Sequence, residues 1–133
     1  MKIVFVETPS PWVVRRNLYV PLGPLYLATI LKEEGYDVRF ARPERIEDIF
    51  QDTDIVCMSG TTLEYPMNVE YATWIKRCRP NIKIFIGGSH VTAMYQDVAE
   101  NGLFDAICVG EGESIILDMV KDAEKNDLKN IYY

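Results

Sequence analysis

Short apolar runs rich in β-branched residues alternate along the chain with longer segments in which apolar residues recur every three or four positions. The first pattern is typical of strands and the second of amphipathic helices. Five runs predict strands, at residues 2–6, 37–41, 54–58, 82–86 and 105–109. The first, third and last are almost wholly apolar, as in strands covered on both faces. The second alternates polar and apolar side chains, as in an edge strand.

Helical spacing of apolar residues separates these runs. The predicted helices span residues 22–34, 66–78 and 116–123, with two shorter ones at 44–50 and 93–100. Gly35 supplies a stop for the first helix, and Pro80 closes the second, because glycine favours the end of a helix and proline cannot continue one.

This alternation predicts an α/β protein with a flavodoxin-like (Rossmann-like) three-layer sandwich. Right-handed crossovers that cover both sheet faces must reverse direction once, which for five parallel strands favours the order 2-1-3-4-5. Ligands of such sheets bind beyond the carboxyl ends of the strands, near the point between strands 1 and 3 where the direction reverses. The loops that follow the strands are therefore the candidate site.

Length and charge narrow the classes of function. The 133 residues suffice for one hydrophobic core, and 14 basic against 20 acidic residues give a net charge of -6. This charge disfavours non-specific binding to nucleic acid or to an anionic membrane. No apolar run reaches the roughly 18–20 residues of a membrane span, and the first residues do not resemble a secretion signal. We therefore expect a cytoplasmic protein that binds a small ligand or another protein.

The cysteines predict neither disulfides nor a metal site. Cys57, Cys78 and Cys108 are an odd number, lie far apart and form no C-x-x-C pair. Two of them fall in apolar strands, as buried reduced thiols do. His90 is the only histidine, so the chain offers too few grouped ligands for zinc or an iron–sulfur cluster. No metal ligand and no catalytic residue is expected in this chain.

Three loops at the expected carboxyl edge are rich in glycine and hydroxyl side chains. They comprise residues 59–62, 87–92 and 110–114. Glycine lets a ligand approach the backbone, and serine or threonine hydroxyls bind polar groups of a ligand. The same residues are also favoured in turns and helix caps without any ligand. Three such loops at one edge favour a binding site.

The spacing of two motifs resembles that of a known family. Ser59-x-Thr61, followed after residues 62–86 by Gly87-Gly88, is similar to the S-x-[LT] and G-G motifs of cobalamin-binding domains. Residues 21–28, 87–92 and 110–113 extend the similarity to the N-terminal B12-binding domain of radical SAM enzymes, in the class that includes magnesium-protoporphyrin IX monomethyl ester cyclase. The resemblance covers residues 1–127.

The resemblance implies that cobalamin is the cofactor. Ser59, Thr61 and Thr62 would contact its nucleotide tail, and Gly87 and Gly88 would allow close approach. The full set of implied cofactor-binding residues is Thr8, Pro9, Ser59, Gly60, Thr61, Thr62, Gly87, Gly88, Ser89, His90, Gly110, Glu111, Gly112 and Glu113.

Two departures from the family pattern shape the expectation. Mutases and methionine synthase carry D-x-H-x-x-G after strand 1, whereas residues 7–12 here read E-T-P-S-P-W. The resemblance then implies cobalamin held base-off without a protein histidine ligand. The C-x-x-x-C-x-x-C motif is also absent, so the [4Fe-4S] cluster and S-adenosylmethionine would belong to a barrel domain outside this sequence. Residues 128–133 would begin the linker to that barrel, which is the expected partner.

Other interpretations stay open. The domain could be a degenerate flavodoxin-like module that positions a partner or substrate without binding cobalamin, with Pro11 and Trp12 obstructing the crevice. His90 could serve only as a hydrogen-bonding turn residue, and Glu111 and Glu113 only as helix caps. A phosphate-binding receiver or a dinucleotide fold is disfavoured, because the acidic cluster of the former and the G-x-G-x-x-G of the latter are missing.

Overall fold

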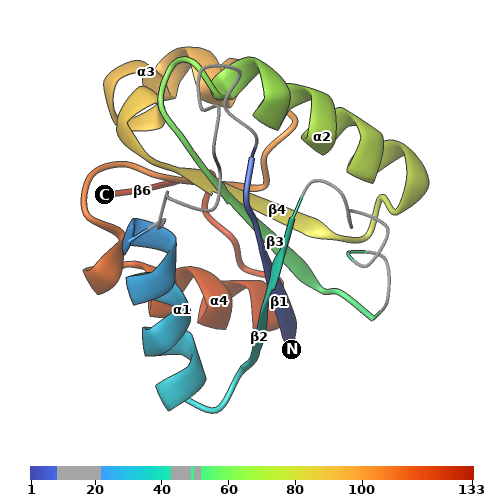
Figure 1. Ribbon diagram of the computed structural model, residues 1–133, viewed down its shortest axis with the longest axis vertical. Helices are drawn as coiled ribbons and strands as arrows, with labels where there is room; N and C mark the ends of the chain where they lie inside the picture. The colour runs from blue at the N-terminus through green and yellow to red at the C-terminus, as the bar shows by residue number, and fades with distance from the viewer. Residues whose placement is uncertain (9–21, 43–48, 50–51) are drawn as a thin grey trace.

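The protein is an α/β sandwich built on a six-stranded parallel sheet with the order β2-β1-β3-β4-β5-β6. The computed structural model describes residues 1–8, 22–42, 49 and 52–133 (Figure 1). The strands are β1 Lys2–Val6, β2 Asp37–Ala41, β3 Ile55–Ser59, β4 Lys83–Gly87, β5 Ala106–Cys108 and β6 Ile131–Tyr132. The predicted fold and the order of the first five strands are confirmed, and a sixth strand extends the sheet beyond β5.

Helices cover both faces of the sheet. They are α1 Leu22–Glu33, α2 Tyr65–Cys78, α3 Ser89–Glu100 and α4 Ile116–Glu124, and a short 3-10 helix η3, Gly112–Ser114, precedes α4. Helices α1 and α4 lie on one face, and α2 and α3 on the other (Figure 1). In the described part of the chain, no helix combines the length and apolar character needed to cross a membrane.

The sheet separates two apolar cores because successive side chains of a strand point to opposite faces. In β1, Ile3 and Phe5 pack under α1 and α4, whereas Val4 and Val6 pack under α2 and α3. Both sets are buried, which accounts for the uninterrupted apolar run. Strand β2 is an edge strand, as its alternating sequence predicted.

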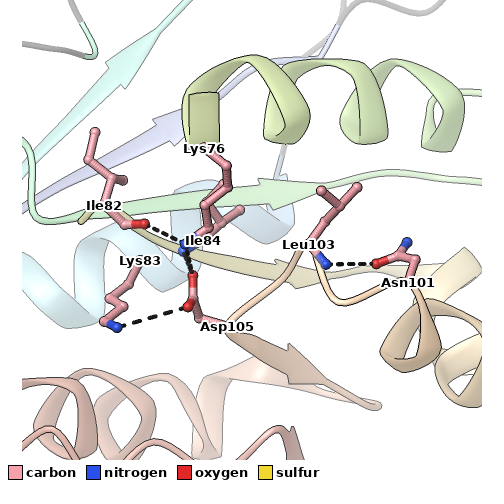
Figure 2. A network of polar contacts seen from close by, with 7 residues as sticks. All are labelled: Lys76, Ile82, Lys83, Ile84, Asn101, Leu103 and Asp105. Carbon is pink, nitrogen blue, oxygen red and sulfur yellow. Dashed lines mark hydrogen bonds and ion pairs between the residues drawn. The ribbon is translucent and has the colours of Figure 1, made fainter. Parts of the chain in front are cut away.

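A polar network fixes the amino end of β5 against β4 and α2 (Figure 2). The Asp105 carboxylate accepts hydrogen bonds from the Ile84 backbone N–H at 2.8 Å and from Lys76 Nζ at 2.6 Å. Lys76 Nζ also donates to the Ile82 carbonyl oxygen at 2.9 Å. Lys83 Nζ lies 4.0 Å from the same carboxylate. These contacts hold β5 at its amino end, whereas the candidate site lies at the carboxyl ends of the strands.

Three local features differ from the sequence predictions. Residues 131–132 form a strand that the sequence did not predict and that pairs with β5; that residues 128–133 begin a linker stays a prediction. Helix α3 starts at Ser89 instead of residue 93 and has an irregular residue at Met94, with φ −124° and ψ 29°. Of the predicted helix at 44–50, only Ile49 is among the described residues, and it is buried.

Candidate functional site

A cavity of about 170 Å³ opens at the carboxyl edge of the sheet, between the sheet and helices α1 and α4. Its walls come from the same face of four adjacent strands and from both helices, and loops that follow β3, β4 and β5 form its mouth. The wall residues include Phe5, Cys57, Phe85, Cys108, Leu27, Ile116 and Met119, and the mouth residues are Ser59, Gly87, Gly88, Gly110, Glu111, Gly112 and Glu113.

The walls are apolar, and no lysine, arginine or histidine is among the described residues that line this cavity. Sites that enclose a whole drug-sized ligand have volumes of roughly 300–1,000 Å³. A cavity of this size has room for a ring-sized apolar part of a ligand but not for a whole ligand of that class.

A second hollow of about 240 Å³ adjoins the cavity above β1 and β3. The two hollows share Gly23, Pro24, Ser59 and Gly88. The second hollow is also lined by Thr8, Gly60, Thr61 and Ser89, and by the acidic residues Glu7 and Glu64. Hydroxyl-bearing residues from three loops therefore meet next to the apolar cavity, at the edge where the predicted reversal of the sheet places a ligand.

Two glycines of the mouth have different roles. Gly88 has φ +103°, and a Cβ there would lie 2.7 Å from the Gly60 carbonyl oxygen, so glycine at this position lets two loops of the protein meet. A Cβ on Gly112 would lie 3.1 Å from Leu27 Cδ2 and 3.7 Å from Cys108 Sγ, at the cavity mouth. A larger residue at 112 would narrow the opening.

Threonines of the second hollow already have protein partners. The Thr61 hydroxyl and backbone N–H donate to the Glu64 carboxylate, the N–H at 3.0 Å. The Thr8 hydroxyl donates to Asn68 Oδ1, and Asn68 is a buried polar residue of α2. These bonds fix the two loops before any ligand arrives.

Comparison with known proteins identifies the family at this point. The model of the B12 binding domain family matches residues 13–120, most of the chain. This chain belongs to the B12-binding domain family. A search of curated proteins found no match. Among solved structures, the N-terminal domain of a hypothetical protein from Thermotoga maritima is similar in fold, with a TM-score of 0.63 and 24% identity over 91% of this chain and 98% of that one.

His90 of this B12-binding domain is the second residue of α3 and lines neither hollow. Its Nδ1 is 3.1 Å from the Thr62 hydroxyl, and its ring stacks on Tyr65 with a centroid distance of 4.2 Å. The Tyr65 hydroxyl accepts a hydrogen bond from Asn101 Nδ2 at 2.9 Å. The geometry agrees with a turn-stabilising role for His90 and Thr62, whose part in cofactor binding stays a proposal.

Two thiols face the cavity of the B12-binding domain. Burial raises the pKa of Cys57, and burial together with the Glu113 and Glu111 carboxylates raises the pKa of Cys108. Both sulfurs are therefore protonated at neutral pH and act as apolar lining. No three His, Cys, Asp or Glu side chains among the described residues are grouped so as to hold a metal ion.

The sequence pointed to the loops of this site but missed its walls. Cys57, Cys108, Leu27 and Met119 line the cavity only because α1 and α4 pack over the sheet, and the sequence pattern carries no separate signal for that. Thr92 belongs to the predicted loop 87–92 but was not among the implied cofactor-binding residues; it accepts a hydrogen bond from the Gly110 N–H at 3.0 Å and so ties α3 to the mouth.

The remaining predictions concern the rim and the first loop. Glu111 begins η3 without a side-chain capping bond, so the structure does not assign it the cap role. Pro9, with Pro11, Trp12 and the rest of residues 9–21, lies outside the described residues.

Proposed function

We propose that this domain binds cobalamin at the carboxyl edge of its sheet, as the cobalamin-binding module of a radical SAM enzyme. The observation that carries the proposal is an apolar, ring-sized cavity beside a hollow rich in hydroxyl groups, in a chain of the B12-binding family. The base of the nucleotide tail would enter the cavity, because an aromatic base is apolar on both faces. The corrin is too large for the cavity and would stay outside.

Residues of four loops would hold the cofactor. Ser59 borders both hollows and is placed to contact the tail where it passes from one to the other. The loop Gly110–Glu113 borders the cavity and would flank the nucleotide. Cobalamin, when bound, supplies the cobalt chemistry, and the part of this chain is to bind and orient it.

We propose further that no histidine of this chain ligates cobalt. The sequence between β1 and α1 contains no histidine. His90, the only one, contacts Thr62 and Tyr65 away from both hollows. Cobalamin would then be bound base-off with no lower ligand from the protein.

Titration of the 133-residue chain with hydroxocobalamin and methylcobalamin, followed by the visible spectrum and by calorimetry, tests the proposal. We expect a saturable change to the base-off spectrum. Absence of binding at high micromolar cobalamin would overturn the proposal and favour a flavodoxin-like module that positions a partner or substrate without binding cobalamin. The radical SAM part is tested by the coding sequence after Tyr133: we expect a C-x-x-x-C-x-x-C motif, and a stop codon or an unrelated domain would refute that part.

Narrowing the cavity should weaken binding. In Gly112→Val the new side chain meets Leu27 at the mouth, and we expect cobalamin affinity to fall at least about tenfold, since 1.4 kcal/mol of lost contact corresponds to a factor of ten. Ala93→Val on the exposed surface of α3 is the control and should keep wild-type affinity. Equal affinities for both variants would show that the tail does not enter this cavity.

A further inference from the structure

Strand β6 is attached to the sheet next to the mouth of the cavity. The Asn130 carbonyl oxygen accepts from the Ile107 N–H at 2.9 Å, and the Tyr132 carbonyl oxygen accepts from the Val109 N–H at 2.8 Å. Val109 immediately precedes the rim loop Gly110–Glu113. Through the hydrogen bond to the Val109 N–H, β6 therefore restrains the residue directly before the rim loop.

The Tyr132 side chain connects the same strand to a wall of the cavity. It is buried, and its hydroxyl donates to Asp122 Oδ2 of α4 at 2.8 Å and accepts from the Lys129 N–H at 3.0 Å. Asp122 follows the cavity-lining Met119 by three residues, on the next turn of the same helix. Tyr132 thus holds β5 through its backbone and α4 through its side chain.

We propose that Tyr132 is a positioning residue for the rim loop Gly110–Glu113, and that docking of β6 and occupancy of the cavity are coupled. The second part rests on the proposed function, because cobalamin is the ligand invoked. A two-residue strand contributes few contacts, so its docking opens more readily than the central strands do. Whatever β6 adds to ligand affinity, the ligand adds to β6 docking by the same factor. The C-terminal segment therefore responds to the state of the cavity.

The test compares Tyr132→Phe with Tyr36→Phe in the 133-residue chain. Tyr36 is a matched control, because its hydroxyl also bonds a carboxylate of α4, Glu124 at 3.3 Å, but neither residue lines the cavity. We expect amide exchange at Val109 and Gly110 to speed up at least about fivefold in Tyr132→Phe, the equivalent of one of the two hydrogen bonds that the Tyr132 hydroxyl makes, and to stay unchanged in Tyr36→Phe. Exchange at Ile84, in the network around Asp105, should not change in either variant.

The reciprocal measurement adds cobalamin to the wild-type chain and follows the amide of Tyr132, whose backbone faces β5. Slower exchange there, together with weaker cobalamin binding by Tyr132→Phe alone, supports the coupling. Cobalamin binding that is equal in both variants, with unchanged exchange at Val109 and Gly110, would overturn the inference. Faster rim exchange in a chain that binds no cobalamin would keep the positioning role of Tyr132, remove the coupling and refute the proposed function.

Discussion

At the edge where the cavity opens, two glycines have different roles: one allows two loops of the protein to approach each other, and the other leaves room for a ligand. Gly88 fills the first role, because a Cβ there would run into the Gly60 backbone. Gly112 fills the second, because the atoms nearest to a Cβ there are the flexible end of Leu27 and the Cys108 sulfur at the cavity mouth. Two glycines that look alike in the sequence therefore affect different measurements, one the stability and the other the affinity.

Gly88→Ala should destabilise the fold. The substitution forces an alanine into φ +103° with its Cβ 2.7 Å from a carbonyl oxygen, so we expect the free energy of unfolding in urea to fall by about 1–3 kcal/mol. Gly87→Ala is the neighbouring control, because its Cβ would sit in ordinary contact, 3.5 Å from Cys108 Cβ. Similar losses in the two variants would contradict this account of Gly88.

The Cys108 thiol should react slowly with alkylating agents at pH 8. Its pKa is raised by burial and by the Glu113 and Glu111 carboxylates, so the reactive thiolate forms only at higher pH than in an exposed cysteine, whose pKa is about 8.5. In a Cys78→Ser background, which removes the exposed thiol, we expect the iodoacetamide rate to rise only at higher pH than for an exposed cysteine, and saturating cobalamin to lower it. A rate at pH 8 equal to that of an exposed cysteine would disprove the prediction.

At the scale of elements, β5 is held from both ends. Asp105 binds α2 and β4 at its amino end, and Thr92 of α3 and Tyr132 of β6 bind the backbone just beyond its carboxyl end. Only the second end borders the cavity. Stability and ligand binding should therefore respond separately to changes at the two ends of this strand.

Asp105→Ala tests the amino end. The change leaves the Ile84 N–H and Lys76 Nζ each without one partner, so we expect a loss of about 1–3 kcal/mol in the free energy of unfolding, with cobalamin affinity preserved. Asp37→Ala is the matched control: its pair with Arg39 is mostly exposed, and the change should be under about 0.5 kcal/mol. Losses of equal size would show that the network around Asp105 contributes no more than a surface ion pair.

The elements that the sequence predicted well are those whose burial produces a regular apolar pattern within the segment itself. The strands from β1 to β5 are apolar runs because helices cover both faces of the sheet, and that leaves a plain trace in the sequence. Strand β6 was missed because its two residues follow the polar Lys129 and Asn130 and depend on β5 for their pairing. The start of α3 was placed near its irregularity at Met94, because the helical pattern is regular only beyond that point. The loops of the site follow from the parallel topology, but the cavity walls depend on how two helices pack.

At the scale of the whole molecule, the two cores differ. The core under α2 and α3 includes the buried residues Ile75, Ile84 and Phe104, whereas the cavity lies in the core under α1 and α4. All proposed contacts to the nucleotide base therefore come from one face of the sheet.

Cobalamin should stabilise the whole domain against heat. A ligand that binds only the folded state adds about 2.7 kcal/mol to the free energy of unfolding at a concentration one hundred times its Kd, enough to raise Tm by several degrees. Calorimetry should also show a negative change in heat capacity on binding, because apolar surface of the cavity becomes buried. Binding seen by the spectrum without any rise in Tm would place the cofactor on partly unfolded chains.

The small residues around the cavity carry a further consequence for evolution. Where a closed core would have leucine or isoleucine, this face has Gly112, Cys57 and Cys108. Once a descendant no longer uses the ligand, selection ceases to keep these positions small, and larger apolar side chains there gain packing energy. Relatives that keep the sheet but have bulky residues at these three positions are therefore expected to be the ones that have lost the cofactor.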